Sequence, residues 1–135
     1  MSQIVAMSCG YDEVAAAVVA KQPHIVDVRT EDEFASGRIP GATNIPLSEV
    51  RHRISVVSIK IFMQVEFAFS LPEEKFQAKY GISKPSKNTT FITSCKVGGR
   101  ATKMRDKLHE MGYKMVKAYT GSLTEWIKMG GEVEK

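Results

Sequence analysis

Six consecutive residues combine a thiol, two glycines and two cations, and this combination suits nucleophilic chemistry. The run Cys95-Lys96-Val97-Gly98-Gly99-Arg100 follows an apolar, strand-like stretch at 89–94 and precedes a helical pattern. Successive backbone N–H groups of such a loop form an anion-binding concavity, and the helix dipole adds partial positive charge. Because cations and helix N-termini lower a thiol pKa from its usual value of about 8.5, we predict that Cys95 is a nucleophile and that residues 96–100 bind an anion.

Two other interpretations of this loop compete with a nucleophile. A free cysteine is often a small buried hydrophobe, but the two glycines and two cations argue against a position in the core. The loop is also similar to that of cysteine phosphatases, which is one residue longer and usually has a histidine before the cysteine. This chain has Ser94 there, so the phosphatase is the disfavoured alternative.

Length and composition narrow the class of protein. A chain of 135 residues fits one domain, 1–135, with a core that needs no disulfide or metal to hold it. The net charge of +4 is mild and weakly favours anionic ligands. Lys and Arg are scattered, with no basic run interleaved with aromatic residues, which argues against nucleic acid as a partner.

Cysteines and histidines are too few and too far apart for a disulfide framework or a metal site. The two cysteines are Cys9 and Cys95, and the three histidines, at positions 24, 52 and 109, lack the spacing of metal ligands. We therefore expect neither a metal nor another cofactor. Cys9 has two interpretations, a resolving thiol for Cys95 or an incidental cysteine, and we favour the second.

The sequence also carries expectations about the compartment. Residues 1–20 contain no Lys or Arg, which argues against a secretory leader and against a mitochondrial one. No stretch has the roughly 18 consecutive apolar residues of a membrane span. We expect no membrane association, and a reducing, cytoplasmic location rather than a mitochondrial one.

Strand and helix patterns alternate along the chain, which predicts an α/β domain around a parallel sheet. Strands are expected at 25–28, 42–46, 89–94 and 115–119, and helices at 12–21, 31–37, 101–111 and 122–130. Thr30 with Glu33, and Ser122 with Glu125, predict capping boxes at two helix starts. Ligands bind beyond the carboxyl ends of such strands, where Asp27, Arg29 and Cys95 fall.

Several segments together resemble the rhodanese (thiosulfate sulfurtransferase) family in its short, single-domain type. They are 26–34, 37–47, the loop 95–100, the stretch 71–81 and a closing motif of Tyr119-Thr120-Gly121 followed by Glu125-Trp126. The order and spacing of these motifs carry the resemblance. It implies a single rhodanese-like domain, with a central parallel sheet flanked by helices on both faces.

The resemblance also implies an activity. The Cys95 thiolate would take a sulfane sulfur from thiosulfate or a similar small anionic donor and carry it as a persulfide. A second nucleophile, cyanide or a thiol such as glutathione or a protein thiol, would then remove that sulfur. The alternative is a non-catalytic binding or regulatory module, because rhodanese-like domains also serve as interaction platforms.

Asp27 and Arg29 are supporting candidates with two interpretations. They could border the substrate pocket, or they could form an ion pair that fastens the strand end to neighbouring loops. Charges at strand ends usually tie loops together, so we favour the structural role.

Residues 51–70 depart from the family pattern, in which one amphipathic helix leads from Leu47 towards Phe76. Strict alternation predicts a strand here, but a helical spacing through Ile54, Ile61, Val65 and Phe69 competes with it. The alternating apolar residues are Val57, Ile59, Ile61, Met63, Val65, Phe67 and Phe69. Three interpretations stay open, in this order: an edge strand or longer helix packed on the core, an interaction surface, or a segment outside the well-folded form.

Overall fold

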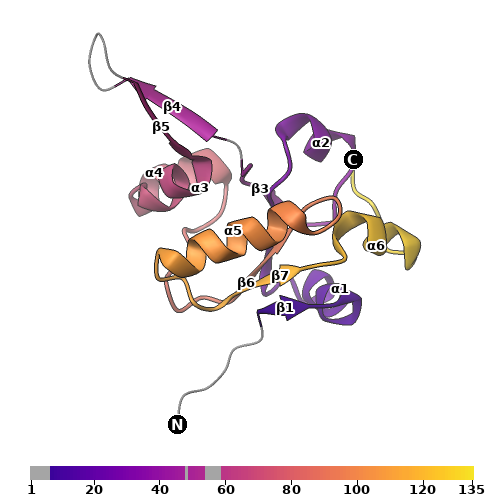
Figure 1. Cartoon of the computed structure of the whole chain (residues 1–135). Coiled ribbons are helices and arrows are strands. Elements are labelled where there is room, and N and C mark those ends of the chain that lie inside the picture. The colour runs from indigo at the N-terminus through magenta and orange to yellow at the C-terminus, as the bar shows by residue number, and fades with distance from the viewer. Residues whose placement is uncertain (1–6, 48, 54–58) are drawn as a thin grey trace.

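A computed structural model describes residues 7–47, 49–53 and 59–135, and it places a five-stranded, all-parallel sheet at the centre (Figure 1). The strand order is β1-β7-β6-β2-β3. The strands are β1 (Ser8–Cys9), β2 (His24–Asp27), β3 (Thr43–Asn44), β6 (Phe91–Ser94) and β7 (Val116–Tyr119). The α/β class and the parallel sheet are therefore confirmed.

Helices cover both faces of this sheet. They are α1 (Tyr11–Ala20), α2 (Glu31–Ser36), α3 (Gln64–Ser70), α4 (Glu73–Tyr80), α5 (Gly99–Glu110) and α6 (Ser122–Lys128). Ile25 and Ile92 pack against α1 and α6, whereas Val26 and Phe91 pack against α3, α4 and α5. Neighbouring residues of a strand point to opposite faces, so the central strand β6 is buried on both sides.

Of the two capping boxes predicted at helix starts, the structure contains one. The box of Thr30 and Glu33 at the start of α2 is confirmed, with both reciprocal hydrogen bonds present. The box predicted for Ser122 and Glu125 is wrong, because Gly121 is the N-cap of α6 and no side chain caps it. Ser122 has a φ of 53°, and its hydroxyl turns to the Tyr119 carbonyl at 2.7 Å.

The atypical segment forms a hairpin followed by a helix. Strands β4 (Glu49–Arg53) and β5 (Ile59–Met63) pair antiparallel with each other and extend away from the main sheet (Figure 1). The predicted strand is right for β5 but wrong beyond Met63, where α3 begins. Val65, Ala68 and Phe69 are buried at helical spacing, so packing on the core decides this part. Val57 and Ile54 lie outside the described residues.

A buried ion pair fixes the end of β2. The Arg29 guanidinium donates to Asp27 Oδ2 at 2.7 Å and to the carbonyls of Glu33 and Gly37 at 3.2 and 2.7 Å. Both ion-pair partners are 4% exposed. This guanidinium therefore ties the strand end to the middle and the C-cap of α2. In the described part of the chain, no helix is both long and apolar enough to cross a bilayer.

We predict that Arg29→Ala lowers the free energy of unfolding by about 3–5 kcal/mol, because it leaves a buried carboxylate without its partner. Urea denaturation measures this loss. The matched control is Arg38→Ala, which removes a more exposed ion pair with Glu134 (3.2 Å) and should cost no more than about 1 kcal/mol. Equal losses in the two variants would contradict a special role for the buried pair.

Candidate active site

The Cys95 loop joins the central strand β6 to helix α5. Ser94 accepts a hydrogen bond from Val28 N at 2.8 Å, which places the start of the loop beside the end of β2. The first N–H groups of α6 bind the next two carbonyls, with Leu123 N to Cys95 O and Thr124 N to Lys96 O, both at 3.0 Å. The loop is thus held through its carbonyls by β2 and α6.

The Cys95 thiol lies at the bottom of this loop and is 1% exposed. The glycines and cations of the loop led us to expect Cys95 outside the core. This expectation is wrong, because Cys95 is buried. Cys95 packs in the same hydrophobic cluster as Val28, Ala101 and Met104. The thiol nevertheless differs from a core cysteine, because Gly98 N donates to its Sγ at 3.0 Å.

Two opposing effects act on the pKa of the Cys95 thiol. Burial disfavours the thiolate and raises the pKa, whereas the backbone N–H groups of Ala101, Gly98 and Val97 and the Ser122 hydroxyl lower it. The hydrogen bonds outweigh burial, so the pKa lies below the ordinary value. The lowering contributions thus come from the loop's backbone N–H groups, as the sequence suggested, and from the Ser122 hydroxyl, whereas the expected charges of Lys96 and Arg100 are not among them.

Gly98 is the glycine that this geometry requires. Its φ of 111° is one that side-chain-bearing residues rarely adopt, and an added Cβ would collide with the Thr120 carbonyl. Gly99 begins α5 and has neither constraint. The two glycines of the motif therefore have different roles, and Gly98 brings its N–H group to the sulfur.

Ser122, which the sequence analysis treated only as a capping residue, is a functional candidate. Its hydroxyl oxygen accepts from Cys95 N at 3.0 Å and lies 3.7 Å from Cys95 Sγ. The single hydroxyl proton can go to Sγ or to the Tyr119 carbonyl at 2.7 Å. Ser122 is fully buried, so water does not compete for this proton.

The structure separates the two cations of the loop. Lys96 and Val97 are exposed, Val97 to 69%. Arg100 instead forms a fork with the Glu33 carboxylate, from Nη1 to Oε1 at 2.6 Å and from Nη2 to Oε2 at 3.0 Å. Glu33 was expected only as a capping residue, since nothing in the sequence pairs positions 67 residues apart.

The remaining candidates are the Asp27–Arg29 pair, at the strand end beside Ser94, and Cys9. Asp27 and Arg29 form the buried pair described above, and Arg29 also donates to the Glu33 and Gly37 carbonyls. Cys9 packs with α1 and α6, in the cluster on the other face from Cys95. Burial raises the pKa of Cys9 to about 11, and Glu13 adds to the rise. Among the described residues, no group of three His, Cys, Asp or Glu is arranged to hold a metal ion.

A cavity of about 240 Å³ opens beside the loop. Its walls are Val28, Thr30, Pro46, Leu47 and Arg100. A positive and a negative side chain lie together at this cavity, because Arg100 forms an ion pair with Glu33. This cavity is the nearest described space in which a small ligand could approach the loop.

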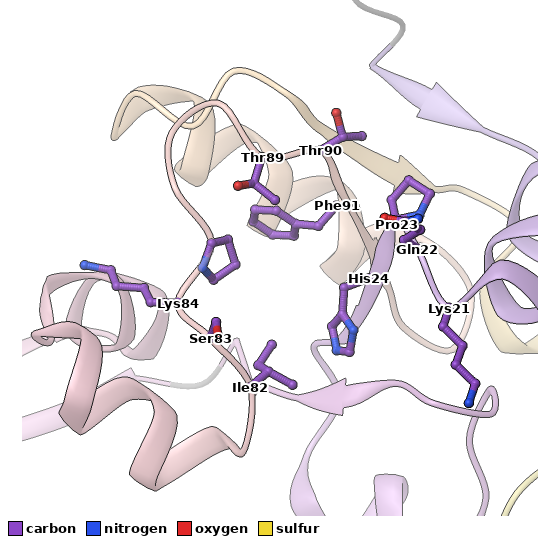
Figure 2. Close-up of a pocket in the computed structure, with 11 residues that line it drawn as sticks. Lys21, Gln22, Pro23, His24, Ile82, Ser83, Lys84, Thr89, Thr90 and Phe91 are labelled. Atoms are coloured by element: carbon purple, nitrogen blue, oxygen red, sulfur yellow. The ribbon is translucent and has the colours of Figure 1, made fainter.

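A larger cavity, of about 590 Å³, lies at the opposite end of the sheet, where β2 and β6 begin at His24 and Phe91. Figure 2 shows that the Lys21 and Lys84 side chains point away from its centre. Lys84 Nζ also donates to the Leu71 carbonyl at 3.0 Å. Neither Cys95 nor any other residue of the 95–100 loop lines this cavity, so it is not the candidate active site.

Comparison with known proteins points to one family. Residues 11–129 match the family model described as a rhodanese-like domain. A provisionally named mitochondrial thiosulfate sulfurtransferase of Schizosaccharomyces pombe is 34% identical over 106 residues, 78% of this chain and 64% of that protein. The thiosulfate:glutathione sulfurtransferase of Homo sapiens is 28% identical over 117 residues, 86% of this chain and 89% of that protein.

Solved structures agree with these relatives. The human single-domain sulfurtransferase TSTD1 superposes with a TM-score of 0.77 at 27% identity, over 91% of this chain and 96% of that chain. This chain spans slightly less than two thirds of the fission-yeast relative, at 64% of its length. It spans nearly the full length of the human structure.

We predict that Ser122→Ala raises the pKa of Cys95, because it removes a hydroxyl that favours the thiolate. The ultraviolet absorbance of the thiolate during a pH titration measures this change. Cys95→Ser supplies the baseline for Cys9.

Ser122→Gly is the matched variant for this titration. It also lacks the hydroxyl but relieves the positive φ of 53°. A rise in both variants assigns the effect to the hydroxyl. If Ser122→Gly keeps the original pKa, the backbone conformation is responsible and the hydroxyl is not.

Proposed function

The chain belongs to the rhodanese-like domain family, as its motifs predicted, and we propose that it is a thiosulfate sulfurtransferase that carries sulfur on Cys95. The observation that carries this proposal is the set of hydrogen-bond donors around one buried sulfur. Gly98 N lies 3.0 Å from Sγ and the Ser122 hydroxyl 3.7 Å from it. Donors fixed in advance stabilise an anionic sulfur without having to reorganise.

In the first half-reaction, the Cys95 thiolate attacks the outer sulfur of thiosulfate. An S–S bond forms between the two sulfurs, and the bond from the outer sulfur to the sulfonate sulfur breaks. Its electron pair leaves with sulfite, and Cys95 keeps a persulfide anion. The hydrogen bonds that lower the pKa of Cys95 favour the thiolate, which is the nucleophilic form.

In the second half-reaction, a thiolate acceptor attacks the terminal sulfur of the persulfide. The new S–S bond forms on the acceptor while the bond to Cys95 Sγ breaks, and Cys95 returns as a thiolate. Glutathione and protein thiols suit this step, and the human relative is named a thiosulfate:glutathione sulfurtransferase. Lys96, Val97, Gly98, Gly99 and Arg100 form the proposed donor site.

Location remains an expectation from the sequence, which favours the cytoplasm. Two of the relatives carry the word mitochondrial in their names. The second candidate function is a non-catalytic binding module. It predicts the same affinity for oxyanions but no covalent change at Cys95, so the mass of the protein separates the two.

We predict that wild-type protein incubated with thiosulfate gains the mass of one sulfur atom at Cys95, and that Cys95→Ser does not. A hydroxyl stays protonated near neutral pH and is a poor nucleophile. Intact-mass spectrometry followed by peptide mapping measures both results. Cys9→Ser is the matched control and should gain sulfur as the wild type does. Sulfur transfer by Cys95→Ser at the wild-type rate would refute the mechanism.

We also predict that Arg100→Ala lowers kcat/KM for thiosulfate by about tenfold, and more than Lys96→Ala does. A guanidinium holds an oxyanion through two parallel hydrogen bonds, whereas a lysine is a flexible point charge. Steady-state kinetics beside a melting curve separate lost rate from lost stability. The assignment of Arg100 is wrong if Lys96→Ala is the more damaging change.

A further inference from the structure

The guanidinium next to the nucleophile already holds an anion of the protein itself. Arg100 and Glu33 meet through two nearly parallel hydrogen bonds, of 2.6 and 3.0 Å. Their side chains are 36% and 33% exposed, so the pair lies where a donor from solvent can reach it. A tetrahedral oxyanion would bind Arg100 through these same two nitrogens.

The Glu33 carboxylate is fixed independently of Arg100. Its Oε1 accepts from Thr30 N at 3.2 Å and from Thr30 Oγ1 at 3.1 Å. The capping box at the start of α2 therefore presents a preformed anion to Arg100. The hydrogen bonds from Arg100, and then from Thr30, hold the pKa of Glu33 at about 2, so this anion persists throughout the working pH range.

The ion pair of Arg100 with Glu33 affects how the cavity beside the loop attracts an anion. Arg100 is the one charged residue among the five that line it, and the other four are Val28, Thr30, Pro46 and Leu47. Whatever attraction the cavity has for an anion depends on Arg100. Glu33 cancels most of that attraction at short range.

On the premise that the chain is the sulfurtransferase proposed above, we propose that Glu33 is a specificity-determining residue that competes with the sulfur donor for the Arg100 guanidinium. A dianionic donor such as thiosulfate must displace the carboxylate to use the guanidinium fully. A monoanionic thiosulfonate carries less charge next to Glu33 and loses less from the competition. Glu33 thus shifts donor preference towards sulfane-sulfur compounds of lower negative charge.

Binding of an unreactive anion tests this competition without any chemistry. In the Cys95→Ser background, titration calorimetry measures the dissociation constant for sulfate, a tetrahedral dianion similar to thiosulfate. Glu33→Gln should tighten sulfate binding by about fivefold, the upper end of what an exposed ion pair contributes. The amide oxygen of Gln can still accept from Thr30, so the helix cap is retained.

Two further variants assign the effect. Glu134→Gln changes the net charge equally and breaks an exposed pair with Arg38, and it should leave sulfate binding unchanged. Adding Arg100→Ala to Glu33→Gln should abolish the gain. If Glu33→Gln fails to fold, Glu33→Asp takes its place. It keeps the charge but shortens the side chain, and it should tighten sulfate binding by a smaller factor.

Donor preference provides the second measurement, in proteins that retain Cys95. Glu33→Gln should raise kcat/KM for thiosulfate relative to that for methanethiosulfonate, whereas a merely structural role would change both equally. The proposal is overturned if sulfate binding is unchanged, or if the gain survives loss of Arg100. An inactive enzyme whose Cys95→Ser form still shows the sulfate effect would refute the sulfurtransferase function but leave the competition intact.

Discussion

The site depends on the Arg29 guanidinium more than on any other single group. It is buried, it neutralises Asp27 at the end of β2, and it holds two carbonyls of α2, that of Glu33 within the helix and that of Gly37 at its C-cap. A six-residue helix with no buried side chain has little packing of its own. Helix α2 in turn presents Glu33 to Arg100. The position of Arg100 therefore depends on two ion pairs in series, its own with Glu33 and the buried pair of Arg29 with Asp27.

The sulfur shows how burial and ionisation can coexist. A thiol in an apolar interior is normally inert, because the thiolate loses its hydration there. Cys95 escapes this outcome since Gly98 and its neighbours direct N–H groups at Sγ, which replace water as donors. For Cys9, burial and the nearby Glu13 carboxylate dominate instead, and the pKa of its thiol rises. The pKa values of two buried cysteines in one chain thus shift in opposite directions because their surroundings differ.

The sequence was sufficient wherever a pattern is local. Alternation and caps located four of the five strands of the main sheet and most helices, and the motif run located the loop from Cys95 to Arg100. The two-residue strand β1 carries no period and was missed. The extent of the strand beyond Met63 was wrong, because the spacing of Val65 and Phe69 fits both a strand and a helix until the core decides.

Contacts between residues far apart in the sequence could not be predicted, because they depend on how the elements pack. The burial of Cys95 depends on α5 packing over β6, and polar composition of the loop gave the opposite impression. Ser122 has the residue types of a capping box around it, yet its φ of 53° turns the hydroxyl towards Tyr119 and Cys95. The pairing of Glu33 with Arg100 joins two helix starts that only the folded sheet brings together.

The hairpin of β4 and β5 has a consequence for how this chain can change. It leaves the domain after β3 and returns at α3, and in the part of the chain that the structure describes none of its strands pairs with the main sheet. Its length is therefore uncoupled from the register of the five parallel strands. Insertions, deletions or grafted peptides at this position alter the outline of the protein while the sulfur site keeps its architecture. The hairpin is a natural point for evolutionary drift and for engineering.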